Sequence, residues 1–377
     1  MFRSELALLL ALLLGGLLGF SSPAALRAQD KQDAKEKEKK DAASFTDEID
    51  VAIVSVVVRV VDTWGRPILG LKPQDFRVKV GKREIPVTGL DWIGESGSDA
   101  PVQAAALPAL PPGVPDEGAI EALTTPPPSP GKLVVFFVQA DLTPSRISGQ
   151  LRLRPFTREL LATLNPPDRA AVVSYDSHLK LWQDFTADRV ATHATLDQAM
   201  LFGDEPARSD LAAGDPVSLA DHFDRADAFA AASPERALEV LGRAMVPLRG
   251  EKTLIFLGWG LGRFSPAGIS GVQMTPAYKP AVRALRAAHA SVFVLDVTSA
   301  DSHSLEAGLE GIAEETGGMY LSTFRLPALA TGVLAKAISG HYVLTLDRAQ
   351  LAGEPGKVSI ELREKSGTVL ARPVSIR

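Results

Sequence analysis

Short, wholly apolar runs alternate with segments of helical periodicity through the middle of this chain. The run Leu133–Val138 has no polar side chain, and Thr253–Leu257 and Ser291–Asp296 have a similar texture. Such runs predict strands that are buried on both faces, as in parallel sheets covered by helices. Further strands are expected at 170–175, 179–182 and 318–321, and helices at 150–164, 187–202, 234–245, 280–289, 304–316 and 326–338. The pattern predicts an α/β domain over residues 132–339, with a doubly wound, mostly parallel, Rossmann-like sheet.

Both ends of the chain have a different, β-rich pattern. Val51–Val61 is mostly β-branched, and Asp75–Val80 alternates polar and apolar residues before Glu84–Leu90 completes a hairpin. Short strands recur in the tail, at 342–346, 358–363 and 369–371. Three or four strands alone bury little apolar surface. We therefore expect residues 45–93 and 340–377 to build one β-sandwich module. A separate C-terminal hairpin module is the alternative.

Two segments lack the pattern of a packed core. Residues 94–131 are rich in Pro and Ala, which predicts an extended linker, with a docking segment for an aromatic groove as the alternative. Residues 203–233 are acidic and rich in Ala and Gly, which predicts a solvated, mobile loop.

The N-terminus carries the features of a secretory signal peptide over residues 1–28. Arg3 precedes the apolar run Leu6–Phe20, and small residues follow. We expect cleavage after Ala24, Ala25 or Ala28, because the run is short for a membrane span of about 20 residues. An uncleaved anchor is the alternative. Residues 29–44 mix Lys with Asp and Glu and predict a charged tether.

Composition narrows the function classes further. The chain has 377 residues, a net charge of -5 and no cysteine. It has no basic footprint for nucleic acid, and its lack of thiols excludes disulfides, thiolate chemistry and a lipid-modified cysteine. We therefore expect an extracytoplasmic protein, periplasmic or secreted, with no stable membrane insertion after signal cleavage.

The stretch after the first central strand carries the clearest candidate chemistry. Asp141, Thr143 and Ser145 offer three oxygens to a hard cation such as Mg²⁺, or else form a polar loop that hydrogen-bonds its own backbone. Ligands of open α/β sheets bind at the carboxyl ends of the strands. We therefore predict a ligand crevice that includes Gln139, Arg146, Ser233, Gly258, Trp259, Gly260 and Arg263.

The sequence has no recognisable catalytic or nucleotide motif. It lacks G-x-S-x-G and H-x-x-x-H, and the glycines at 258, 260 and 262 fail the dinucleotide spacing because Arg263 follows them. We expect a non-enzymatic binding module. A hydrolase or cofactor enzyme with an unrecognised site, and a structural envelope protein with a vestigial crevice, are the alternatives.

Several motifs carry a family resemblance. Besides Asp141–Ser145, they are LNPPDRAAVV (Leu164–Val173), DFTAD (Asp184–Asp188) and LEGIAEETGG (Leu309–Gly318). With these motifs, residues 132–339 resemble a von Willebrand factor type A domain. VVDTWGRP (Val60–Pro67) and GLKPQDF (Gly70–Phe76) extend the resemblance to the secreted VWFA-related proteins common in acidobacteria.

The resemblance implies an adhesion or scaffolding module that recognises a protein partner at this crevice. Typical members hold a divalent metal there through Asp-x-Ser-x-Ser, a Thr from a second loop and an Asp from a third. Here the third loop reads Gly258-Trp259-Gly260, and the second offers only Ser233. Gln139 is an alternative occupant of the first acidic position. The resemblance thus implies a degenerate metal site with weak or no Mg²⁺ and no other cofactor. We further hypothesise that Arg146 or Arg263 takes the place of the cation and holds Asp141, with solvated arginines as the alternative. Recognition is then expected to use Trp259, the arginines and the loop backbone.

Overall fold

A computed structural model describes residues 53–94, 131–203, 206, 217–265, 271–351 and 356–376. All of them belong to one compact unit, Val51–Arg377. The expected signal peptide, the charged tether and nearly all of the linker lie outside the described residues. Within the described part, every helix is too short or too polar to cross a membrane.

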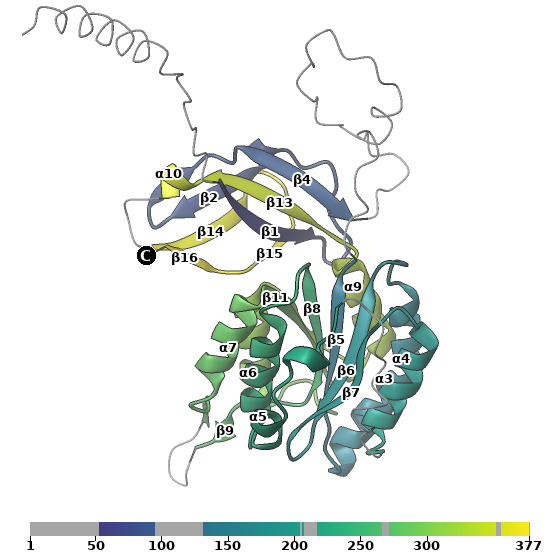
Figure 1. Ribbon diagram of the computed structural model, residues 1–377. Helices are drawn as coiled ribbons and strands as arrows, with labels where there is room; N and C mark the ends of the chain where they lie inside the picture. The colour runs from purple at the N-terminus through teal and green to yellow at the C-terminus, as the bar shows by residue number, and fades with distance from the viewer. Residues whose placement is uncertain are drawn as a thin grey trace, which may run out of the picture. The chain divides into compact units, whose positions relative to one another are not determined.

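The middle of the chain forms a six-stranded sheet between two layers of helices (Figure 1). Its strand order is β12-β11-β8-β5-β6-β7, and only β7 runs antiparallel to its neighbour. The strands are β5 (Leu133–Gln139), β6 (Arg169–Tyr175), β7 (Leu179–Thr186), β8 (Lys252–Gly258), β11 (Ala290–Asp296) and β12 (Met319–Ser322). The prediction of an α/β domain with a mostly parallel sheet is confirmed.

The apolar run of β5 is continuous because helices cover both of its faces. Leu133, Val135 and Phe137 pack with α6 (Pro234–Met245), α7 (Tyr278–Ala287) and α8 (Glu306–Thr316). The alternate residues, Val134, Phe136 and Val138, pack with α3 (Pro144–Ala162), α4 (Arg189–Met200) and α9 (Pro327–Ala337). Complete burial of one such side chain contributes about 1.5–3 kcal/mol, so this strand anchors the domain.

Two expectations about local structure were wrong. The helix after β5 begins at Pro144, six residues before the predicted start at Gln150, and Pro155 lies inside it. Pro144 at the first turn is a favourable helix start because its missing N–H would have no partner inside the helix there. Ser145 and Arg146 therefore lie in the first turn of α3 and not in an open loop.

The acidic insertion is folded over its second half. It contains η3 (Ala220–His222) and α5 (Arg225–Phe229), and Leu219 is fully buried. The carboxylate of Asp184 accepts hydrogen bonds from the backbone N–H groups of Leu219 and Ala220. The expectation of a solvated, mobile loop is therefore wrong for residues 217–233.

Strands from the two ends of the chain share two further sheets. One has the order β15-β1-β13-β4 and the other β16-β14-β2-β3. Their bounds are β1 (Ile53–Val61), β2 (Phe76–Val80), β3 (Arg83–Ile85), β4 (Gly89–Gly94), β13 (Gly340–Asp347), β14 (Gly356–Leu362), β15 (Thr368–Ala371) and β16 (Val374–Ile376). Val58 and Leu344 of the first sheet belong to one apolar cluster with Val78 and Val358 of the second. Because β1 pairs with β13 and β2 with β14, a separate C-terminal hairpin is excluded.

The remaining short elements connect these layers. They are η1 (Pro73–Asp75), β9 (Arg263–Phe264), β10 (Val272–Gln273) and α10 (Arg348–Leu351). The hairpin of β9 and β10 directly follows the carboxyl end of β8 and so belongs to the predicted crevice side.

Candidate functional site

The candidate site lies where the chain leaves β5 and β8 at the carboxyl edge of the sheet. These two strands are neighbours, and the sheet grows from them in opposite directions. A doubly wound sheet opens a crevice at such a switch point. Gly149 of α3 lets residues 297–299, which follow β11, approach the same edge, because an added Cβ would overlap the carbonyl of Val297.

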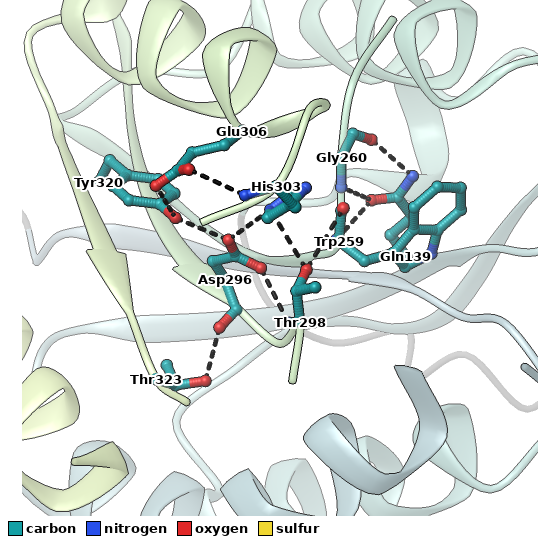
Figure 2. Close-up of polar contacts among 9 residues, drawn as sticks. All are labelled: Gln139, Trp259, Gly260, Asp296, Thr298, His303, Glu306, Tyr320 and Thr323. Carbon is teal, nitrogen blue, oxygen red and sulfur yellow. Dashed lines mark hydrogen bonds and ion pairs between the residues drawn. The ribbon is translucent and has the colours of Figure 1, made fainter. Parts of the chain in front are cut away.

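Gln139 joins the end of β5 to the loop after β8 (Figure 2). Its side chain is fully buried. The amide oxygen accepts from the backbone N–H groups of Trp259 at 2.9 Å and Gly260 at 3.3 Å, and Nε2 donates to the Gly260 carbonyl at 2.9 Å. Gln139 therefore fixes the loop through both its amide oxygen and its amide nitrogen.

Asp141 is held from within its own segment. Oδ1 accepts from the Thr143 N–H at 2.6 Å, and Oδ2 forms an ion pair with Nη1 of Arg146. Burial raises the pKa of this carboxyl, but the hydrogen bonds from Thr143 and Arg146 outweigh burial and bring the pKa below its ordinary value. Asp141 is therefore ionised at neutral pH and compensated by one guanidinium.

Arg146 is held on a second side by an aromatic ring. Its guanidinium carbon lies 3.4 Å from the ring centroid of Trp259, which is the geometry of a cation–π stack. The arginine side chain keeps 28% of its surface exposed. Asp141, Arg146 and Trp259 thus form a rigid, partly exposed cluster across the β5–β8 switch point, and we call it the Arg146 cluster.

The residues at this edge do not fit a magnesium ion. Both oxygens of Asp141 have partners in the protein, and the loop Gly258–Gly260 contains no carboxylate. Ser145 lies within α3, and the Ser233 hydroxyl accepts from the Arg236 N–H at 3.2 Å as the N-cap of α6. Mg²⁺ demands near-octahedral oxygen ligands and dehydrates reluctantly. Among the described residues, no three His, Asp or Glu side chains are arranged to hold a metal.

The structure brings together some of the predicted crevice residues. One chain of contacts runs from Gln139 to the loop Gly258–Gly260, from Trp259 to Arg146 and from Arg146 to Asp141. Ser233 is the N-cap of α6, and Arg263 is exposed on β9. Neither has a contact with the Arg146 cluster among those found in the described residues.

A second polar network at the same edge was missed by the sequence interpretation (Figure 2). Asp296, buried at the end of β11, accepts from His303 Nε2 at 2.7 Å and lies 2.6 Å from the Tyr320 hydroxyl. That hydroxyl is also 2.9 Å from Glu306, and burial together with the two carboxylates raises the pKa of Tyr320. Thr298 connects this network to the Trp259 carbonyl at 3.5 Å.

The geometry of His303 does not make a nucleophile relay. The Asp296 carboxylate and the Thr298 hydroxyl, at 3.3 Å, both approach the same ring nitrogen, Nε2. A relay needs the orienting carboxylate on one imidazole nitrogen and the nucleophile on the other. The network is therefore suited to holding the loops after β8, β11 and β12 in one arrangement.

Comparisons with known proteins find similar solved structures but no similar sequence. No family model matches the sequence, and no curated protein matches it. The conserved hypothetical protein BatB from Bacteroides thetaiotaomicron is 13% identical, with 55% of this chain and 97% of that chain covered and a TM-score of 0.34. A von Willebrand factor type A structure from Catenulispora acidiphila is 13% identical, with 66% of each chain covered and a TM-score of 0.36.

A third likeness is to a pilus protein. The three N-terminal domains of the type V pili tip protein Mfa5 from Porphyromonas gingivalis are 10% identical, with 57% of this chain and 50% of that chain covered and a TM-score of 0.37. These likenesses are too weak to assign a family. What the chain itself shows is an α/β fold with a six-stranded, mostly parallel sheet.

Proposed function

We propose that this protein is an extracytoplasmic, non-enzymatic binding module that recognises a protein partner through the carboxyl edge of its six-stranded sheet, without a bound metal. The observation that carries the proposal is the Arg146 cluster. The guanidinium lies against Asp141 and Trp259 at the switch point and supplies the positive charge that a degenerate metal-ion-dependent site lacks. Asp141 then has a structural role and is not a metal ligand.

The surroundings of the cluster support recognition of a protein. Leu142 follows β5 and is 70% exposed, Phe264 follows β8 and is 66% exposed, and Leu326 follows β12 and is 60% exposed. These exposed apolar side chains follow strands of the same sheet as the Trp259–Arg146 pair, and Trp and Arg are enriched in interface hot spots. The histidine geometry described above gives no support to a hydrolase.

The proposal includes the finer architecture and the location of the protein. The two sheets built from the chain ends form a β-sandwich module, as their shared apolar cluster indicates. Residues 1–28 direct export and are removed, so the mature protein acts in the periplasm or outside the cell. N-terminal sequencing of envelope material should find a first residue between Ala25 and Gln29, and a chain that begins at Met1 would contradict this part.

Affinity capture from an extracytoplasmic extract tests the proposed function. The immobilised mature protein should retain the same partner with Mg²⁺ and with EDTA, and Trp259→Ala should lose it. Trp64→Ala is the matched control, because Trp64 is 54% exposed in a turn after β1 and contributes nothing to the cluster. Arg146→Gln provides a second variant that removes the charge and preserves most of the side chain.

The alternatives predict different results. Retention of the partner that depends on Mg²⁺ would contradict the proposal that recognition needs no metal. Retention that is unchanged in both Trp259→Ala and Arg146→Gln would place recognition elsewhere. Absence of any retained protein would favour a structural envelope protein with a vestigial crevice.

A further inference from the structure

A cavity of about 510 Å³ lies at the opposite, amino-terminal edge of the parallel sheet. Lys132, Asp168, Glu251 and His289 line it, and they directly precede β5, β6, β8 and β11 in turn. Residues of β1, β4 and β13 also line the cavity, and all of the lining residues belong to the one compact unit. Small-molecule sites typically have about 300–1,000 Å³, so the volume suits a small organic ligand.

The cavity contains a cation, Arg372, that has no counter-charge among the described residues. Arg372 lines it, and its guanidinium has no hydrogen bond or ion pair within the described part of the chain. Burial and the neighbouring Arg286 lower the pKa of Arg372, as expected for a desolvated cation beside another one. Removing an unpaired guanidinium from water is unfavourable, and an anion in the cavity would offset that cost.

The two carboxylates that line the cavity are already compensated. Glu251 forms an ion pair with Arg59, and it lies 2.9 Å from Nδ1 of His341. Asp168 accepts from the backbone N–H groups of Lys132 at 2.8 Å and Asn165 at 2.9 Å. Neither carboxylate is available to Arg372, so the positive charge of the cavity is not neutralised from within.

The rest of the wall is partly apolar and also includes the polar side chains of Asn165, Ser339 and His341. Val57 of β1, Ile93 of β4 and Val343 of β13 line the cavity, and Ile93 is 43% exposed. Pro167 adds a further apolar surface beside the cationic side. A ligand that satisfies both walls has a compact apolar body and one anionic group.

From this arrangement we propose that the cavity is a binding site for a small amphipathic anion, with its carboxylate on Arg372 and its apolar body against Val57, Ile93 and Val343. The site is separate from the carboxyl-edge crevice and does not depend on the proposed partner function. Octanoate is the simplest probe with this chemistry, because it has one carboxylate and a short, flexible apolar chain.

Isothermal titration of the full mature protein with three probes tests the site. Octanoate should bind with saturation, at least tenfold more tightly than 1-octanol, which lacks the charge, and inorganic phosphate, which lacks the apolar body. Arg372→Gln should weaken octanoate binding at least tenfold. Arg325→Gln is the matched control, because Arg325 is exposed and paired with Asp301. The affinity of this variant for octanoate should equal that of the wild type.

A second pair of variants keeps the test decisive if Arg372→Gln does not fold. Ile93→Glu places a competing carboxylate in the cavity at a partly exposed position, and Ile93→Lys alters the same surface without repulsion. Octanoate should bind the lysine variant at least tenfold more tightly than the glutamate variant. Three results would overturn the proposal: no saturable binding of octanoate, an affinity for 1-octanol or phosphate equal to that for octanoate, or equal octanoate affinity of the two Ile93 variants.

Discussion

At the scale of single residues, one buried amide organises the candidate site. Gln139 hydrogen-bonds the backbone N–H groups of Trp259 and Gly260 and the carbonyl of Gly260. Trp259 is positioned by this contact, and its ring in turn lies against Arg146. The geometry of the cluster therefore depends on a residue that does not itself touch the surface.

Replacing Gln139 with alanine should destabilise the protein by about 2–4 kcal/mol. The change leaves the buried N–H and carbonyl groups of Gly260 without partners, and each lost partner costs about 1–3 kcal/mol. Urea unfolding measures the difference. Gln273→Ala is the control, because Gln273 is exposed on β10, and it should stay within about 0.5 kcal/mol. Equal stability of Gln139→Ala and wild type would show that the loop is held by other contacts.

At the scale of elements, close packing of α3 against the segment after β11 shapes the site. The Ser299 hydroxyl donates to the Ser145 carbonyl at 3.1 Å, and Gly149 lies one turn further along the helix. A side chain at position 149 would displace the backbone of Val297. The segment that carries Thr298 and Ser299 would then separate from the first turn of α3.

Gly149→Ala should therefore destabilise the protein by about 1–3 kcal/mol, the usual range for overpacking, although alanine favours helices. Gly332→Ala in α9 is a matched change, because nothing lies within 4 Å of the added Cβ. It should leave stability unchanged or raise it by up to about 1 kcal/mol. Thermal unfolding compares the two, and a stabilised Gly149→Ala would contradict the packing described.

The elements also show which features the sequence could predict. Strand β5 was predictable because six apolar residues in succession fit a strand covered on both faces, and that pattern is local. The start of α3 was missed because Pro155 suggested a start or kink, whereas Thr143 and Pro144 define the true start. The Asp296–Tyr320 contact was not predictable, because the two residues are 24 positions apart and meet only after β11 and β12 pair.

At the scale of the whole molecule, the two ends of the chain depend on each other. β13 lies between β1 and β4, and β14 lies beside β2, so the tail supplies the partners of the N-terminal strands. The six-stranded sheet takes no strand from either end. Its stability should be largely separable from that of the terminal strands.

Deleting residues 340–377 should make residues 53–94 sensitive to protease, because their backbone partners and the shared apolar cluster are lost. Residues 132–339 should remain resistant, since their sheet and helices are complete. Limited proteolysis with mass spectrometry measures the cleavage of both segments in one sample. If residues 53–94 resist cleavage as in the full chain, the terminal strands are independent of the tail.

The central claim is that Arg146, and not a metal, compensates Asp141 at the carboxyl edge of the sheet. Titration calorimetry of the purified mature protein with Mg²⁺ and Mn²⁺ tests it most directly. We predict no saturable binding of either ion, because both oxygens of Asp141 are engaged and the loop at 258–260 offers no second carboxylate. Saturable binding in the low-micromolar range that disappears in Asp141→Ala would contradict the account.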